Sequence, residues 1–212
     1  MWPPRVQHKA PSTGIVKYWL ARTWLQLLGW NVTGELPPDK KFVLIGAPHT
    51  SNWDFVIAIP ALYVLRIKAY WMGKHSLFRW PLGYFMRRLG GIPIDRRSAH
   101  GVVAQTVQQF QQNERLVILI PAKGTRGKTR YWKSGFYHIA RLAGVSVVCG
   151  YLDFDSKTAH IGYSFRPSGN IREDMDRVRE FFAPARGRHV ELEDSIRLKE
   201  EDDLMAADSE RQ

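Results

Sequence analysis

The stretch Lys41-Phe-Val-Leu-Ile-Gly-Ala-Pro-His-Thr-Ser-Asn-Trp-Asp54 decides the fold, because an apolar run leads straight into a polar loop. The apolar residues 41–47, followed by Pro48, predict a strand. The chain becomes apolar again at Trp53 and stays so for three helical turns, which predicts a helix over 53–66. A strand that leads through a short loop into a helix is the basic unit of an α/β fold.

The loop between these two elements carries His49 and Asp54. Five helical steps would separate their side chains by roughly 140°, so the two cannot share one face of a helix. They can meet if His49 lies in the loop and Asp54 in the first helical turn, where the carboxylate would orient a basic imidazole. Ser51 and Asp54 also form a capping-box pattern, so Asp54 has a purely structural interpretation as well.

Strands and helices alternate along the rest of the chain, which predicts an α/β fold with a largely parallel sheet flanked by helices. In such sheets the loops at the carboxyl ends of the strands build the site, and here these are 48–54, 90–96 and 121–130. Residues 31–40 are expected to form a connector. The further elements expected are a strand at 69–72, helices at 76–89, 101–113 and 134–143, and strands at 116–120 and 145–152.

Three regions are expected from composition: an N-terminal helix region (1–30), a catalytic domain (31–190) and an acidic, weakly ordered tail (191–212). The helix over 14–30 combines Trp19 and Trp24 with basic residues. This amphipathic pattern suits either core packing or a membrane interface. The aromatic and basic segment 76–89 allows the same two interpretations.

The net charge of +11 is unevenly distributed: residues 1–170 carry +16 and residues 171–212 carry −5. A body this basic indicates an anionic partner. A single cysteine fits a reducing compartment, and no apolar run is long enough to span a bilayer. We therefore expect a cytoplasmic protein that binds peripherally to the cytoplasmic face of a membrane. The seven histidines show no paired spacing for a metal, and no cofactor is required.

Four ordered blocks are more specific than any one of them. After the His49–Asp54 block come Gly90-Gly-Ile-Pro-Ile-Asp-Arg96, Pro121-Ala-Lys-Gly-Thr-Arg126 and Val145-Ser-Val-Val148. Their order and spacing resemble the glycerolipid acyltransferase family, in particular its 1-acylglycerol-3-phosphate acyltransferases. The resemblance covers about Phe42 to Leu152 and implies a glycerol-3-phosphate-acyltransferase-like fold.

The resemblance also implies a reaction and roles for individual residues. A fatty acyl group would move from acyl-CoA or acyl-carrier protein to the hydroxyl of a lysophospholipid acceptor, in phospholipid synthesis. His49 would be the general base and Asp54 would orient it. Arg96 and Arg126 would bind the acceptor phosphate, since guanidinium groups suit bidentate phosphate recognition. The remaining substrate-binding positions of the third block are Lys123, Gly124 and Thr125.

Two positions depart from the family pattern. Lys123 stands where a glutamate is usual, and Ser146 where a proline is usual. Lys123 replaces an anion by a cation in the acceptor region, which leaves the activity in doubt. On the sequence alone, Lys123→Glu is expected to raise transferase activity.

Two other classes of function are open. Residues 122–129 come one residue short of a phosphate-binding P-loop, because Ala122 replaces the first glycine. This alternative predicts nucleotide binding. The second alternative is a non-catalytic basic module that binds anionic lipid. No nucleic-acid-binding motif is visible, so nucleic acid is not an expected partner.

Overall fold

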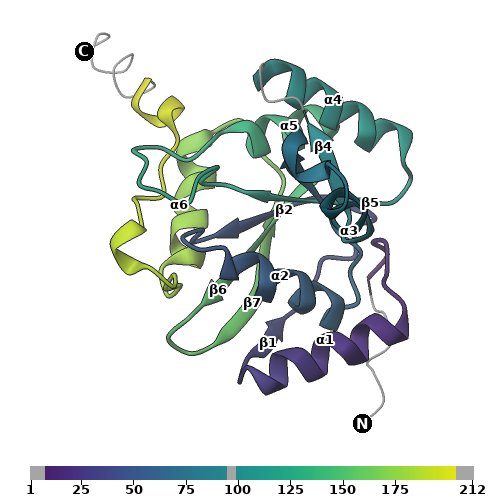
Figure 1. The fold of residues 1–212 in the computed structure, drawn as a ribbon. Coiled ribbons are helices and arrows are strands. Elements are labelled where there is room, and N and C mark those ends of the chain that lie inside the picture. Colours follow the sequence, from purple (N-terminus) through teal and green to yellow (C-terminus); the bar gives the residue numbers. More distant parts are fainter. Residues whose placement is uncertain (1–7, 95–98, 204–212) are drawn as a thin grey trace, which may run out of the picture.

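The computed structural model describes residues 8–94 and 99–203, and within these residues seven strands form one sheet (Figure 1). Their order across the sheet is β1-β7-β6-β2-β5-β3-β4. The strands are β1 (Asn31–Gly34), β2 (Lys41–Ala47), β3 (Tyr70–Lys74), β4 (Gly91–Ile94), β5 (Leu116–Pro121), β6 (Ser146–Asp153) and β7 (Thr158–Phe165).

Five adjacent strands, from β6 to β4, run parallel, and β6 and β7 pair antiparallel. The carboxyl ends of β6, β2, β5, β3 and β4 therefore meet at one edge of the sheet. The register pairs Gly46 of β2 with Pro121 of β5 and with Gly150 of β6. The loop with His49 thus leaves the sheet between the loops that follow β5 and β6.

Helices cover both faces of the sheet (Figure 1). Alternation along β2 sends Val43 and Ile45 to the face covered by α4, α5 and α6, while Phe42 and Leu44 face the side of α2. Helix α1 packs on α2 beyond the second face. The helices are α1 (Ile15–Leu27), α2 (Trp53–Val64), α3 (Leu82–Arg88), α4 (Ala99–Gln112), α5 (Gly135–Ala143) and α6 (Ile171–Phe182), with short 3₁₀ helices η1 (His75–Phe78) and η2 (Val190–Leu192).

The predicted α/β fold with a largely parallel sheet is confirmed, but three local expectations differ from the structure. The segment 76–89 is split into η1 and α3 at Pro81, which lacks the N–H needed to continue a helix. The expected connector 31–40 begins with a strand, β1, because it pairs with β7. The antiparallel hairpin partner β7 and the helix α6 were not foreseen.

Helix α1 has apolar side chains on opposite faces. Tyr18, Ala21 and Leu25 are buried against the body, while Leu20 and Leu27 are 68% and 79% exposed. Core packing and surface exposure are therefore both present in this helix, on different faces. No helix within the described residues is long and apolar enough to cross a membrane.

Residues 191–203 are packed, in contrast to the weakly ordered tail expected from their acidity. Leu198 is fully buried, and its backbone forms an isolated parallel β-bridge with that of Trp132. Glu201 accepts a hydrogen bond from Arg179 at 2.9 Å. Burial of apolar residues and pairing of the acids outweigh the local negative charge. Residues 204–212 lie outside the described part of the chain.

Candidate active site

His49 and Asp54 meet at the carboxyl end of β2. The Nδ1 atom of His49 lies 2.9 Å from Oδ2 of Asp54. A carboxylate accepts hydrogen bonds, so this contact places the proton on Nδ1 and leaves the lone pair on Nε2. The imidazole is about one-quarter exposed, and Nε2 has no hydrogen-bond partner among residues 8–94 and 99–203. The ring is therefore arranged to accept a proton from outside the protein.

Asp54 also holds the loop that carries His49. Its Oδ2 atom accepts hydrogen bonds from the backbone N–H groups of Thr50 and Ser51, both at 3.0 Å. The hydroxyl of Ser51 accepts in turn from the N–H of Trp53 at 3.2 Å. The carboxylate oxygen that contacts His49 is therefore also the one that accepts from the backbone N–H groups before α2. Because the residue is 94% buried, these bonds form where water competes little.

The third block forms a tight turn after β5, the strand next to β2. Gly124 adopts a positive φ of 73°, and a Cβ at this position would lie 2.7 Å from the side chain of Lys133. Thr125 and Arg126 are exposed at the tip of the turn, where the Thr125 hydroxyl accepts from the N–H of Gly127. The guanidinium of Arg126 is thus presented to solvent at the same edge of the sheet as His49.

Lys123 does not point to solvent with its neighbours. It is 2% exposed, and its ammonium lies 2.8 Å from Oδ2 of Asp194. The ammonium also donates a hydrogen bond to the carbonyl of Leu192. The sequence favoured a substrate-binding role for Lys123, and in the structure its ammonium contacts protein groups from the C-terminal segment. No local feature of the sequence points to Asp194, which lies 71 positions further along the chain.

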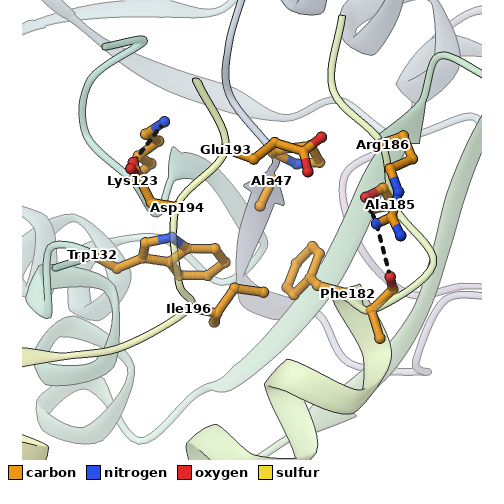
Figure 2. Close-up of a pocket in the computed structure, with 11 residues that line it drawn as sticks. Ala47, Lys123, Trp132, Phe182, Ala185, Arg186, Glu193, Asp194 and Ile196 are labelled. Atoms are coloured by element: carbon orange, nitrogen blue, oxygen red, sulfur yellow. Dashed lines mark hydrogen bonds and ion pairs between the residues drawn. The ribbon is translucent and has the colours of Figure 1, made fainter. Parts of the chain in front are cut away.

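A cavity of about 190 Å³ opens beside this ion pair (Figure 2). Trp132, Phe182 and Ile196 form its apolar wall, and Lys123 and Asp194 line its polar side. Ala47 and Pro48 also line it, so the cavity lies next to the loop with His49. Figure 2 shows the Lys123–Asp194 pair at its margin.

Two further residues bear on the composition of the site. Arg96 lies outside the described residues. The strand that precedes it in the sequence, β4, ends at Ile94 on the edge where β2 and β5 also end. Cys149, the only cysteine of the chain, is fully buried in β6, and burial raises the pKa of its thiol well above the usual range. Cys149 is therefore not an available nucleophile.

An oriented histidine at the carboxyl edge of a largely parallel sheet suits general-base chemistry, and comparison with known proteins shows the family to which the chain belongs. The family model described as Acyltransferase matches residues 30–152, more than half of the chain. The chain belongs to the glycerolipid acyltransferase family.

The individual relatives share 30% or less of their sequence with this chain over the matched region. The chain is 30% identical over 132 residues to the 1-acyl-sn-glycerol-3-phosphate acyltransferase of Escherichia coli (strain K12), a match covering 58% of this chain and 52% of that protein. The chain thus spans about half the length of this curated relative. The crystal structure of the 1-acyl-sn-glycerophosphate (LPA) acyltransferase from Thermotoga maritima has a similar fold, with a TM-score of 0.55 at 16% identity over 83% of this chain and 77% of that chain.

Proposed function

We propose that the protein is an O-acyltransferase that esterifies a lysophospholipid such as 1-acylglycerol-3-phosphate with a fatty acyl group from a thioester donor, acyl-CoA or acyl-carrier protein. The observation that carries this proposal is the His49–Asp54 pair at the carboxyl edge of the sheet, in which Nε2 has no hydrogen-bond partner within the described part of the chain. Such a pair supplies a general base of the kind that a hydroxyl nucleophile needs.

In the proposed reaction, Nε2 of His49 removes the proton of the acceptor hydroxyl. The hydroxyl oxygen then forms a bond to the thioester carbonyl carbon, and the bond from that carbon to sulfur breaks. The proton held by His49 passes to the leaving thiolate, so the ring returns to its starting state. Asp54 stabilises the imidazolium formed in between, because its carboxylate lies 2.9 Å from Nδ1.

The acceptor phosphate would bind beside His49 to the arginine of the third block. Arg126 is exposed on the turn after β5, and Gly124 allows this turn because of its positive φ. Arg96 would add a second guanidinium from the segment that follows β4. The net charge of +16 over residues 1–170 favours the approach of an anionic lipid.

An apolar groove of about 370 Å³ between α1 and α2 would seat an acyl chain. Phe55 and Val56, the two residues after Asp54, line one part of the groove, and Trp24 of α1 lines another. The groove therefore begins at the first turn of α2, the turn that also carries Asp54. Lipid tails and such a groove are both apolar, so the transfer of a chain into it is favoured by the hydrophobic effect.

The same side of the molecule offers a surface for peripheral membrane binding. Leu20 and Leu27 of α1 are exposed, and Trp80, between η1 and α3, is 90% exposed. The guanidinium of Arg88 lies over the ring of Tyr84, which is 56% exposed, and that of Arg87 lies over the buried ring of Phe78. Exposed aromatics beside basic residues suit an anionic bilayer surface, which would be the cytoplasmic face.

The proposal is tested with radiolabelled acyl-CoA and acyl-carrier protein against a panel of lysolipids with and without a terminal phosphate. We expect acyl transfer to 1-acylglycerol-3-phosphate and at least about tenfold less to monoacylglycerol, in line with the loss of a charge-assisted phosphate contact. Transfer to every lysolipid at one rate would contradict the assignment of the phosphate site.

The structure offers less support for the P-loop alternative. A P-loop requires a helix that starts at its lysine and threonine, whose N–H groups then face the phosphates. Here α5 begins at Gly135, six residues after Thr129, and the N–H of Thr129 donates to Asp194 at 2.9 Å. A non-catalytic lipid-binding module would not need the His49–Asp54 pair.

A further inference from the structure

The segment after α6, residues 186–194, runs along the carboxyl edge of the sheet and contacts the ends of three adjacent strands. We name residues 186–194 the strap. It begins at the end of β6, where the N–H of Arg186 donates to Asp153 at 3.2 Å and the carbonyl of Arg186 accepts from Phe154 at 2.8 Å. It then passes the loop after β2 and ends on the loop after β5.

At its far end the strap is anchored by the Lys123–Asp194 ion pair. Asp194 accepts from Lys123 at 2.8 Å and from the N–H of Thr129 at 2.9 Å with the same oxygen. The side chains of both charged partners are more than 90% buried. Removal of either partner would leave an uncompensated buried charge, so this pair strongly favours the docked strap.

In its middle the strap packs on the loop that holds His49. The N–H of His189 donates to the Thr50 hydroxyl at 3.2 Å. A Cβ on Gly187 would lie 2.8 Å from that same hydroxyl oxygen, so only glycine allows this close approach. The guanidinium of Arg188 lies over the ring of Trp53, 4.9 Å from its centroid.

Thr50 links the strap to the His–Asp pair. Its hydroxyl accepts from the strap, while its backbone N–H donates to the Asp54 oxygen that contacts His49. A second link lies within the strap, where Glu193 accepts from the N–H of Gly187 at 2.5 Å. These hydrogen bonds, joined by short stretches of backbone from Asp194 to Glu193 and from Gly187 to His189, connect the Asp194 anchor to the carboxylate of Asp54.

We infer that the strap positions the His49–Asp54 loop and that Lys123 is a positioning residue, paired with Asp194, rather than a ligand of the acceptor. The part of this inference that concerns rate rests on the proposed acyltransferase function. Lys123 acts through Asp194, Gly187 and Thr50 on the orientation of the imidazole. Lys123, the cation that stands where the family usually has a glutamate, is thus paired with Asp194 of the strap.

The test combines a double-variant cycle with hydrogen–deuterium exchange of the peptide that contains residues 48–54. In Lys123→Met and Asp194→Asn we expect exchange in this peptide to rise about tenfold and kcat to fall about tenfold, with KM for the donor nearly unchanged. The double variant should show no lower kcat and no faster exchange than either single variant, because the effects of contacting residues are not additive. The coupling between such residues corresponds to factors of roughly 2 to 150 in an equilibrium constant. An exposed ion pair of α6, Arg177–Glu173, supplies the control Glu173→Gln, in which neither quantity should change.

A second pair of variants tests the link at Thr50 without disturbing a buried charge. Thr50→Val keeps the shape but removes the acceptor for the N–H of His189, so faster exchange and a lower kcat are expected, whereas Thr50→Ser should retain both parent values. Parent-like exchange at 48–54 in the Lys123, Asp194 and Thr50→Val proteins would overturn the inference. Multiplicative losses in the double variant would also overturn it. If the parent shows no acyl transfer, the proposed function fails, and the exchange measurements still decide on the strap.

Discussion

One carboxylate oxygen of Asp54 accepts from the ring of His49 and from the N–H groups of Thr50 and Ser51. The geometry of the base and the geometry of its loop therefore depend on the same atom. This explains why a His and an Asp five positions apart can act as a pair. The loop, rather than a helix face, brings them together.

Replacement of Asp54 by Asn tests the charge of this group separately from its shape. The amide oxygen can still accept the loop N–H groups, but it no longer stabilises an imidazolium. We expect kcat to fall by about two orders of magnitude or more, while the melting temperature changes by only a few degrees. Steady-state kinetics and calorimetry measure the two effects. An unchanged kcat would show that the carboxylate has only a capping role.

Lys123→Glu is expected to behave differently from the prediction made on sequence alone. A glutamate at this buried position would face the Asp194 carboxylate and the Leu192 carbonyl, so three acceptors would meet without the ammonium that now donates to two of them. We expect a loss of stability of roughly 3–5 kcal/mol, which is typical of an unpaired buried charge, together with lower transferase activity. Urea unfolding measures the first quantity. A variant more active than the parent would instead support the earlier prediction.

At the level of elements, α1 shows two apolar faces, and only one of them packs on the protein. Removal of residues 1–30 would delete the whole of α1. The structure buries Tyr18 and Leu25 against the body, so this truncation would expose apolar surface on α2. Substitution of the outer face is therefore the cleaner test of membrane contact.

The double variant Val16→Gln/Leu27→Gln changes two exposed side chains of that outer face. We expect its affinity for anionic vesicles to fall by about tenfold or more, because each apolar side chain contributes on the order of 1.5–3 kcal/mol when it enters an apolar phase. Co-sedimentation measures this, and calorimetry should show an unchanged melting temperature. Leu142→Gln on α5, an equally exposed site on the other side of the sheet, is the matched control. Equal losses in both proteins would contradict a specific role for α1.

The contact of α5 with α6 gives a prediction at alkaline pH. Burial, together with the hydrogen bond to Asp174, raises the pKa of Tyr137 from 10.0 to about 12. The unfolded chain therefore loses this proton first, and the contribution of Tyr137, roughly 2–3 kcal/mol, is present below pH 10 and lost between pH 10 and about 12.

Unfolding free energies of the parent and Tyr137→Phe, measured across this range, test the prediction, since titration of the other groups is common to both proteins. The difference in stability between them should shrink as the pH rises. A difference that stays constant up to pH 12 would contradict the assignment.

For the molecule as a whole, the fold and the contact between His49 and Asp54 could be predicted from the sequence because their signals are local. The run 41–47 and the spacing of His49 and Asp54 each occupy one short stretch. The strap could not be predicted, since its partners Lys123 and Asp194 are far apart and the acidity of residues 191–203 suggests solvation. Pairing with β7 likewise decides that β1 is a strand.

Part of the negative charge near the C-terminus is paired inside the folded protein. Residues 171–212 carry a net charge of −5, but several of their acids are used inside the body, among them Asp174, Asp194 and Glu201. The basic surface of residues 1–170 is therefore not covered by a free acidic tail within the described chain. We expect binding to anionic vesicles to weaken as salt rises from 0.05 to 0.5 M, because exposed charges are screened over about 10 Å at 0.1 M. Binding that is independent of salt would indicate purely apolar contact.

In the proposed mechanism, Nε2 of His49 takes the proton of the acceptor hydroxyl. Its most direct test compares kcat/KM for acyl transfer from acyl-CoA to 1-acylglycerol-3-phosphate in the parent and in His49→Ala, with folding of both proteins verified by circular dichroism. We expect the variant to retain less than about 1% of the parent value, in line with the roughly 10²–10⁴-fold contribution of general-base catalysis. A folded His49→Ala protein that transfers the acyl group at the parent rate would contradict it.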